Sequence, residues 1–154
     1  MSTVYLATDH AGFELKEKVK IYLESKGGHD VYDCGALTLE PGDDYPALIA
    51  RAAEKISYDS MHDPAYGIVF GGSGTGEAIV ANRFAHVRAV PFSGGNLELI
   101  KLAREHDDAN VLSIGARFVT EKEACQAIDL FFATPFSHDE RHAERVIQIE
   151  EITQ

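Results

Sequence analysis

A carboxylate stands directly after a glycine-rich run, in a pattern that suits proton transfer. Glu77 follows the run Gly71-Gly72-Ser73-Gly74-Thr75-Gly76. Residues 66–70 form an apolar run of strand length and residues 78–82 show helical periodicity, so the run is a strand-to-helix turn. Free N–H groups at such a turn attract anions, and the helix dipole adds to the attraction. Glu77 therefore suggests a base beside a developing oxyanion. The alternative is a first-turn glutamate that only favours the helix N-terminus.

Two common nucleotide-binding fingerprints do not fit this turn. The G-x-G-x-x-G pattern that starts at Gly72 requires glycine at position 77, and the P-loop spacing of Gly71 and Gly76 requires lysine there. Glutamate occupies the position, so a nucleotide phosphate would meet a negative charge. The turn suits proton chemistry on a small molecule better than nucleotide binding.

Other ionisable side chains stand at the ends of predicted elements. Asp9 and His10 follow the first strand, where they either contact a ligand or form a helix cap with a surface histidine. His106 ends a helix, and taken alone it is a C-terminal residue favoured by the helix dipole. Arg141 and Arg145 lie one helical turn apart, so their charges repel. A bound phosphate would compensate this repulsion; a solvated face or an intersubunit salt bridge is the alternative.

Two further patterns do not indicate a metal site or a disulfide. His138 and His142 have the i,i+4 spacing of a metal pair, but they lack the glutamate of the His-Glu-x-x-His motif and a third ligand, so no metal is predicted. Cys34 and Cys125 have no disulfide-framework or Cys-x-x-Cys spacing. They are interpreted as reduced thiols that pack as small apolar residues.

Length and charge limit the class of protein. The chain has 154 residues, enough for one domain with a substantial core. Its formal charge of −11 argues against nucleic acid or an anionic membrane as partner, and a phosphorylated substrate would need cations gathered locally. The start of the sequence has no basic segment followed by an apolar one, and no run approaches membrane-spanning length, so we expect a cytoplasmic protein.

Apolar runs of strand length alternate with helical periodicity along the whole chain. Strands are predicted near 3–8, 30–34, 66–71, 88–92 and 111–115, and helices near 11–26, 45–59, 76–84, 95–105, 120–133 and 138–152. This alternation predicts one domain over 1–154 with a three-layer α/β/α, Rossmann-like fold, a five-stranded parallel sheet and an extra C-terminal helix. Ligands of such sheets bind outside the carboxyl ends of the strands. We therefore expect Asp9, His10, the loop 35–45, the glycine-rich turn and Arg117 on one rim.

Several short motifs, in order and with matching spacing, resemble the type B ribose-5-phosphate isomerases, whose superfamily also contains the galactose-6-phosphate isomerase subunits. The resemblance runs from Val4 to about Ile152. The motifs are Asp9-His10-Ala11-Gly12, Asp44-Tyr45-Pro46, Gly72-Ser73-Gly74-Thr75-Gly76, Ala81-Asn82-Arg83-Phe84, Arg88-Ala89-Val90, His106 with Asp108 and Asn110-Val111-Leu112, Gly115-Ala116-Arg117, and Arg141-His142 with Arg145.

The resemblance implies roles for individual residues. Some family members carry a catalytic cysteine before the glycine-rich turn and others a glutamate after it; Gly71 and Glu77 place this chain in the second group. Glu77 would move the proton between C1 and C2 of a sugar phosphate, Ser73 and the N–H groups of the turn would stabilise a cis-enediolate, and His106 would open the sugar ring. Substrate-binding positions would be Asp9, His10, Tyr45, Gly72, Gly74, Thr75, Gly76, Arg117, Arg141 and Arg145, with the arginines on the phosphate. The family usually has asparagine where this chain has Asp107.

The resemblance also implies an assembly and a substrate class. We expect a homodimer, or a dimer of dimers, with an active site shared between protomers, and a reaction that needs no cofactor. Ribose 5-phosphate is the first candidate substrate. Allose 6-phosphate, galactose 6-phosphate with a different partner chain, and a non-catalytic sugar-phosphate-binding module are the alternatives. The loop 35–45 and residues 92–96 are expected to set the preference between sugars.

Overall fold

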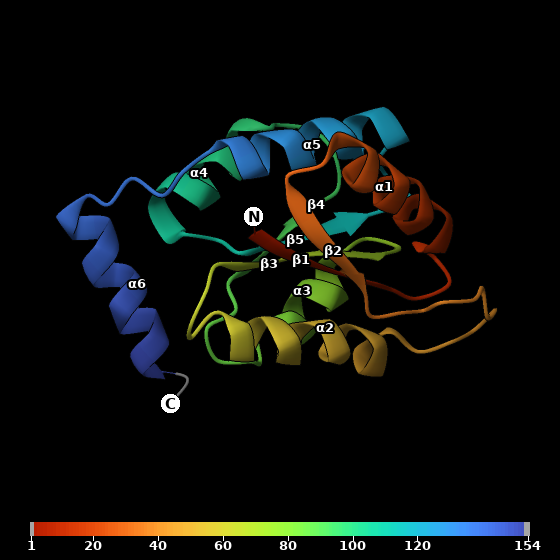
Figure 1. Cartoon of the computed structure of the whole chain (residues 1–154), viewed down its shortest axis with the longest axis horizontal. Coiled ribbons are helices and arrows are strands. Elements are labelled where there is room, and N and C mark those ends of the chain that lie inside the picture. The colour runs from red at the N-terminus through yellow and green to blue at the C-terminus, as the bar shows by residue number, and fades with distance from the viewer. Residues whose placement is uncertain (1, 153–154) are drawn as a thin grey trace.

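The computed structural model describes residues 2–152 and forms three layers (Figure 1). Its elements, in chain order, are β1 (Ser2–Thr8), α1 (Phe13–Lys26), β2 (His29–Asp33), α2 (Tyr45–Asp59), β3 (Ala65–Gly71), α3 (Thr75–Ala81), β4 (Ala89–Phe92), α4 (Glu98–Asp107), β5 (Val111–Gly115), α5 (Glu121–Ala133) and α6 (Glu140–Ile152). The predicted domain also includes residues 1, 153 and 154, which lie outside the described residues.

The five strands form one parallel sheet in the order β2-β1-β3-β5-β4. Helices α1, α4 and α5 cover one face, and α2 and α3 cover the other (Figure 1). The central strand β3 is buried almost throughout because helices cover both of its faces, so its sequence is a continuous apolar run. The predicted α/β fold with a five-stranded parallel sheet is confirmed.

A hydrophobic core lies on each side of the sheet. Alternate residues of one strand enter different cores: Val4 and Leu6 of β1 pack with α1 and α5, whereas Tyr5 and Ala7 pack with α2 and α3. Phe70 and Val69 divide in the same way on β3. Both cores contain side chains of β1 and of β3, so packing on the two faces of the sheet holds these strands in place relative to each other.

The carboxyl ends of β1 and β3 form the switch point of the sheet. These strands are neighbours, but the chain leaves β1 towards α1 on one face and leaves β3 towards α3 on the other. The two connections therefore diverge at this end of the sheet, which is where ligands of open parallel sheets bind.

Two helix boundaries differ from the predicted ones. Helix α3 ends at Ala81 rather than near residue 84, because the Asn82 side chain turns away to exchange two hydrogen bonds with the backbone of Ala89. Helix α4 begins at Glu98 rather than near 95, because Gly94 and Gly95 both have φ of +91°, outside the helical region.

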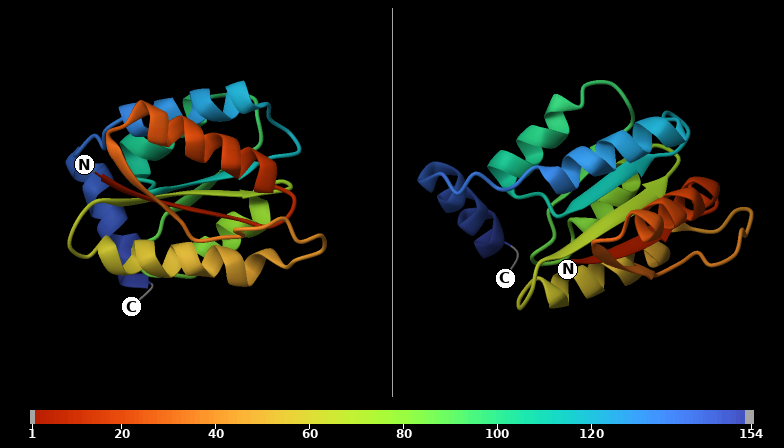
Figure 2. Two further views of the ribbon diagram at one scale, coloured as in Figure 1. Left: turned by 45° about the vertical axis from the view of Figure 1, so that its right-hand side comes forward. Right: turned by 45° about the horizontal axis from the view of Figure 1, so that its top comes forward.

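Helix α6 stands outside the three layers. Figure 2 shows it at the end of the sheet near the N-terminus, joined to α5 by an extended segment. It packs against α4, with which it shares its main contacts. Within the described residues, none of the helices is both long and apolar enough to cross a membrane.

Candidate active site

Glu77 is buried at the start of α3, with 4 % of its surface exposed. Its carboxylate lies against Gly71, because a Cβ built on that glycine would be 1.8 Å from Oε1 and 2.0 Å from Cδ of Glu77. Burial raises the pKa of the Glu77 carboxyl, and the charge of Asp9 raises it further, although the glutamate's own N–H opposes the shift. A carboxylate with a raised pKa is suited to act as a general base near neutral pH.

The glycine-rich loop, residues 71–76, packs directly on the end of β5. Gly74 has φ of +78°, and a Cβ there would lie 2.7 Å from the carbonyl oxygen of Ser113. A Cβ on Gly115 would lie 2.5 Å from the carbonyl oxygen of Ser73. Glycine is therefore required at both positions by close backbone approach. The loop follows β3 at the switch point, where the sequence predicted it.

Two side chains from other elements contact the same loop. Tyr45 lies at the start of α2, and a Cβ built on Gly76 would be only 2.5 Å from its hydroxyl oxygen. The Arg117 guanidinium lies beside Gly72, with Nη1 3.1 Å from the position of a Cβ there. Within residues 2–152, no carboxylate is within ion-pair distance of Arg117. The arginine is thus available to an anion bound at the loop.

Asp9 and His10 complete this end of the sheet. Asp9 is buried, and its Oδ1 accepts a hydrogen bond from the Ala11 N–H at 3.0 Å. Asp43, in the loop after β2, accepts hydrogen bonds from the His10 N–H at 2.7 Å and pairs with His10 Nδ1 at 2.8 Å. The hydrogen bond to Asp43 raises the pKa of His10, which favours the cationic imidazole. Asp43 is a residue that the sequence did not single out.

Oxygen and nitrogen atoms of Asp9, His10 and Asp43 lie within 4.8 Å of one another. Two of these groups are already paired with each other, and Asp9 caps the turn at Ala11. Asp43 thus fixes the His10 imidazole, and Asp9 fixes the backbone turn that follows it.

A fully buried lysine holds the start of the loop after β2. Lys16 of α1 has no exposed surface, and its Nζ donates to Asp33 Oδ2 at 2.6 Å and to the Ala36 carbonyl at 2.7 Å. The backbone of Gly35 and Ala36 in turn pairs with Thr8, the last residue of β1. Lys16 therefore links the loop after β2 to the strand end that carries Asp9. The sequence reasoning missed it, because a lysine on an amphipathic helix is expected to face water.

His106 lies at the opposite end of the sheet. It is the second-last residue of α4, and its ring stacks on the ring of His142 with centroids 4.2 Å apart. His142 is buried and its Nδ1 is 2.8 Å from the Ser137 hydroxyl. The Ser137 N–H donates to the Glu105 carbonyl at 3.0 Å. These contacts dock the start of α6 on the end of α4, so His142 has a structural role rather than the metal-binding role considered with His138.

Arg141 and Arg145 are exposed on α6, beside the stacked histidines. No carboxylate of the described residues is within ion-pair distance of either guanidinium. Their pairing with an anion therefore stays a prediction, and the anion would have to come from outside the chain. Asp107, which replaces the family's usual asparagine, is exposed at the end of α4.

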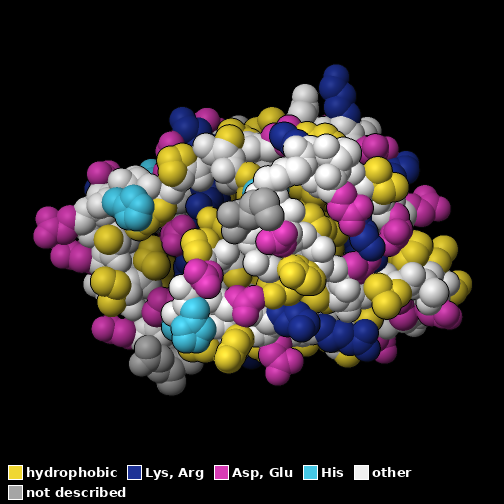
Figure 3. All heavy atoms as spheres, viewed as in Figure 1, with side chains coloured by type: hydrophobic (Ala, Val, Ile, Leu, Met, Phe, Trp, Pro, Cys, Tyr) yellow, Lys and Arg dark blue, Asp and Glu magenta, His cyan; other side chains and the backbone are white. Residues whose placement is uncertain are grey.

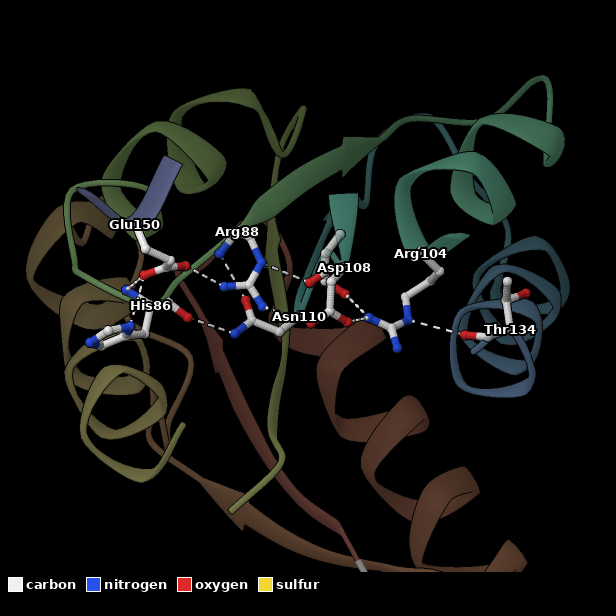
Figure 4. Close-up of polar contacts among 8 residues, drawn as sticks. His86, Arg88, Arg104, Asp108, Asn110, Thr134 and Glu150 are labelled. Atoms are coloured by element: carbon white, nitrogen blue, oxygen red, sulfur yellow. Dashed lines mark hydrogen bonds and ion pairs between the residues drawn. The ribbon is translucent and has the colours of Figure 1, made fainter. Parts of the chain in front are cut away.

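A polar network holds the far end of α6 (Figure 4). Arg88, just before β4, pairs through Nη1 with Glu150 of α6 and through Nη2 with Asp108 at 3.1 Å. Asp108 also accepts from Arg104 Nη1 at 2.8 Å, and Glu150 pairs with His86 Nδ1 at 2.7 Å. Arg88 thus connects Asp108, two residues after His106, to α6, the helix that carries Arg141 and Arg145.

The predicted site residues therefore form two groups at opposite ends of the sheet. The first group, at the carboxyl ends of the strands, contains Asp9, His10, Tyr45, Gly72, Ser73, Gly74, Thr75, Gly76, Glu77 and Arg117. The second group, at the amino ends, contains His106, Arg141 and Arg145. The seven residues of β3 alone span about 20 Å between these ends. One copy of the chain does not bring the two groups together.

Exposed apolar side chains lie at both ends. Figure 3 shows hydrophobic side chains on α6 and, at the other extreme of the molecule, on the loop after β2. On α6 they are Ile147, Ile149 and Ile152, which are 57 %, 41 % and 81 % exposed; on the loop they are Leu37 and Leu39, 71 % and 49 % exposed. Each group of site residues thus has an uncovered apolar surface on a nearby segment.

Comparisons with known proteins identify the family. The family model described as Ribose/Galactose Isomerase matches residues 4–149. The chain is 43 % identical to ribose-5-phosphate isomerase B of Mycolicibacterium paratuberculosis over 144 residues, which cover 93 % of this chain and 86 % of the relative. It is 42 % identical to ribose-5-phosphate isomerase B of Mycobacterium tuberculosis, over 93 % of this chain and 85 % of that relative.

Solved structures are similar over almost the whole length. The ribose-5-phosphate isomerase B of Mycoplasma genitalium with bound ribulose-5-phosphate has a TM-score of 0.90 and 32 % identity, and the match covers 98 % of this chain and 95 % of that chain. The ribose 5-phosphate isomerase B of Anaplasma phagocytophilum has a TM-score of 0.86 and 36 % identity, with 96 % and 95 % covered. The motifs, the fold and these similarities together show that the chain belongs to the ribose/galactose isomerase family.

Proposed function

We propose that this protein interconverts ribose 5-phosphate and ribulose 5-phosphate through a cis-enediolate, with Glu77 as the base. The observation that carries the proposal is the buried Glu77 carboxylate, whose pKa is raised, next to a glycine-rich loop in a chain about 42 % identical to ribose-5-phosphate isomerases B.

The chemistry follows from the positions of these groups. The Glu77 carboxylate removes the proton from C2 of the open-chain aldose, and the electron pair of the C–H bond moves to form the C1–C2 double bond while the carbonyl oxygen becomes an enediolate. Backbone N–H groups of the loop stabilise that oxygen, and a donor of this kind is typically worth about 3–4 kcal/mol in the transition state. The proton of the C2 hydroxyl then passes to O1, which leaves the negative charge on O2. As O2 forms the new carbonyl, the electron pair of the C1–C2 double bond takes the proton back from Glu77 at C1, which gives the ketose.

The second group of residues enters the site from another copy of the chain. We infer a homodimer, or a dimer of dimers, in which His106, Arg141 and Arg145 of one protomer face the glycine-rich loop of its partner. The separation of the two groups along the sheet supports this, and so do the exposed apolar surfaces on nearby segments. In such a site His106 opens the sugar ring, and the arginines bind the phosphate together with Arg117.

Substitution of the base tests the reaction. Glu77→Gln keeps the size and shape of the side chain but cannot accept the proton, so kcat for ribose 5-phosphate should fall by several orders of magnitude. Exchange of the C2 proton with deuterated solvent should be lost with it. A folded Glu77→Gln protein that turns over at nearly the wild-type rate would refute the assignment, and a wild-type protein that binds sugar phosphate without exchange would be a binding module.

Mixing two inactive variants tests the shared site. Glu77→Gln lacks the base of its own site, whereas His106→Gln lacks the group that it gives to its partner. A mixed dimer contains one site with both defects and one intact site, so refolding the two variants together should restore activity. Mixing Glu77→Gln with Asp9→Asn is the matched control, because both residues belong to the same end of one chain and no intact site forms. Equal activity in the two mixtures would contradict a site shared in this way.

A substrate panel tests the sugar. The chain, purified alone, should have its highest kcat/KM for ribose 5-phosphate among ribose 5-phosphate, allose 6-phosphate and galactose 6-phosphate. Preference for a hexose phosphate would assign the exposed loop after β2 to a longer substrate.

The two cysteines are unpaired and half-buried, which fits the reducing cytoplasm that we propose for the protein.

A further inference from the structure

Two serine side chains bind the glycine-rich loop from behind. The Ser93 hydroxyl, just after β4, donates to the Ser73 carbonyl at 2.5 Å. The Ser113 hydroxyl, in the middle of β5, donates to the Gly74 carbonyl at 2.6 Å. Ser113 has no exposed surface, so its hydroxyl is a polar group buried inside the sheet, where it is paired with this carbonyl. A buried hydroxyl costs stability unless it is paired, so its position matters for the loop.

These hydrogen bonds fix the direction of two N–H groups. A peptide group is planar and trans, so the N–H of one residue points opposite to the carbonyl of the residue before it. Because the carbonyls of Ser73 and Gly74 point towards β4 and β5, the N–H groups of Gly74 and Thr75 point away from these strands. Within the described part of the chain, the Gly74 N–H has no acceptor, and the Thr75 N–H has only Ser73 Oγ at 3.3 Å.

The backbone continues the same arrangement along the loop. The Gly71 carbonyl accepts from the Ala116 N–H at 2.8 Å, and the Gly72 carbonyl accepts from the Arg117 N–H at 3.1 Å. Four successive carbonyls of the loop are therefore held on the β5 side. The neighbour of β3 on the other side is β1, whose end carries Asp9, so N–H groups turned away from β5 lie on the β1 side of the loop.

Without the hydroxyls, the peptide between Ser73 and Gly74 would have an alternative. Glycine adopts positive and negative φ with similar ease, so a peptide plane next to Gly74 rotates at low cost unless something holds it. No backbone donor among the described residues reaches the Ser73 carbonyl; Ser93 is its partner. Rotation of this plane would replace the Gly74 N–H on the β1 side of the loop with a carbonyl oxygen, which repels an enediolate.

We propose that Ser93 and Ser113 are positioning residues for the isomerisation: their hydrogen bonds to the Ser73 and Gly74 carbonyls aim the N–H groups of Gly74 and Thr75 at the enediolate oxygen. They act through the loop and do not contact the substrate. This inference rests on the proposed function, since it names the residues that orient the oxyanion donors of that same site.

A matched pair of substitutions isolates the Ser93 hydroxyl. Ser93 is exposed, so a larger side chain fits, and Ser93→Thr and Ser93→Val differ only in the presence of a hydroxyl. Ser93→Val should lower kcat by about 10-fold to 10²-fold, the range expected when a donor is misaligned rather than removed, whereas Ser93→Thr should keep kcat within about threefold of wild type. Ser113→Ala should lower kcat less than Ser93→Val, because the Gly74 carbonyl also accepts from the Ala78 N–H at 3.1 Å. Ser25→Ala, which removes an exposed hydroxyl from α1, is the control and should behave as wild type.

Binding of two probes separates orientation of the loop from general damage. A phosphorylated hydroxamate mimics the planar enediolate, whereas ribitol 5-phosphate carries the phosphate but has no carbonyl or enediolate. Ser93→Val and Ser113→Ala should lose affinity for the hydroxamate in parallel with kcat, while KM and the affinity for ribitol 5-phosphate change less than about twofold.

The outcomes are distinct. Unchanged kcat in Ser93→Val, equal kcat in Ser93→Val and Ser93→Thr, or equal loss of both probes would overturn the proposal. If Ser113→Ala fails to fold, the Ser93 pair still decides. If wild-type protein does not isomerise any sugar phosphate, the proposed function fails; if Glu77→Gln is inactive while Ser93→Val is fully active, only the present inference fails.

Discussion

Replacing Gly71 with alanine tests whether the position of the Glu77 carboxylate controls the reaction. The new Cβ would lie 1.8 Å from Oε1, 2.0 Å from Cδ and 2.6 Å from Oε2 of Glu77. An ordinary contact between such atoms is about 3.4 Å or more, so the carboxylate must move by about 1.5 Å. A displacement of about 1 Å at a reacting group costs on the order of 10²-fold in rate. We therefore expect kcat for ribose 5-phosphate to fall by at least about 10²-fold.

The stability of the protein should change little in this variant. Gly71 ends β3 with a φ outside the left-handed region, so alanine adopts its backbone without strain. A compatible glycine-to-alanine change restricts the unfolded chain and adds about 0.4–1 kcal/mol, which offsets part of the cost of moving the Glu77 side chain. Thermal unfolding and kcat should be measured on the same preparation. We expect kcat to fall while the unfolding temperature stays close to that of the wild type.

A double-variant cycle shows whether alanine at position 71 acts through the base. If it acts only by moving Glu77, then Gly71→Ala combined with Glu77→Gln should be no slower than Glu77→Gln alone, because the base is already absent. Losses that multiply in the double variant, or a Gly71→Ala enzyme that keeps a third of the wild-type kcat, would refute the reasoning.

Four further predictions concern ionisation and the docking of α6. Because burial raises the pKa of Glu77, kcat/KM should fall on the acid side at a pH above about 4.3, the ordinary glutamate value; a limb at or below that value would contradict a buried base. The same raised pKa means that ionisation of Glu77 reduces stability as pH rises through it, so Glu77→Gln should unfold at a higher temperature than wild type at pH 8 but not at pH 4. Asp43→Asn should lower the pKa of the His10 imidazole in an NMR titration, since the hydrogen bond to Asp43 is the main cause of its raised value, and an unchanged titration would exclude this pairing in solution. Arg88→Gln should weaken the attachment of α6 by about 1–3 kcal/mol, because Glu150 loses a charged partner in a mostly buried pair. Faster amide exchange confined to α6 is the expected sign, and unchanged exchange would mean that the remaining contacts of α6, including the pair between Glu150 and His86, are enough to hold the helix.

The fold could be predicted from sequence because its signals are local. Each strand is an apolar run bounded by turn residues, and the pairing of Thr120 with Glu123 marks the start of α5 as a capping box that the structure contains. The boundaries that were wrong depend on longer-range contacts. The end of α3 is set by the hydrogen bonds between Asn82 and Ala89, which no periodicity reveals.

The site could be predicted only in part. The rule for parallel sheets correctly placed Asp9, His10 and the glycine-rich loop at the same edge, since it depends on chain direction alone. Lys16 and Asp43 were not found, because their importance arises from partners that are 17 to 33 residues away in the chain. The ring contact between His106 and His142 was also hidden, since the two histidines come from different helices.

The placement of the two groups of site residues at opposite ends of the sheet determines how the catalyst should respond to dilution. In the shared site that we propose, a lone protomer would have the base without the ring-opening histidine, so turnover per molecule should decline as the protein concentration approaches the dissociation constant of the pair. Substrate held by both copies would favour association, so a dilute sample should show a lag before its full rate, and the lag should shorten as more sugar phosphate is supplied.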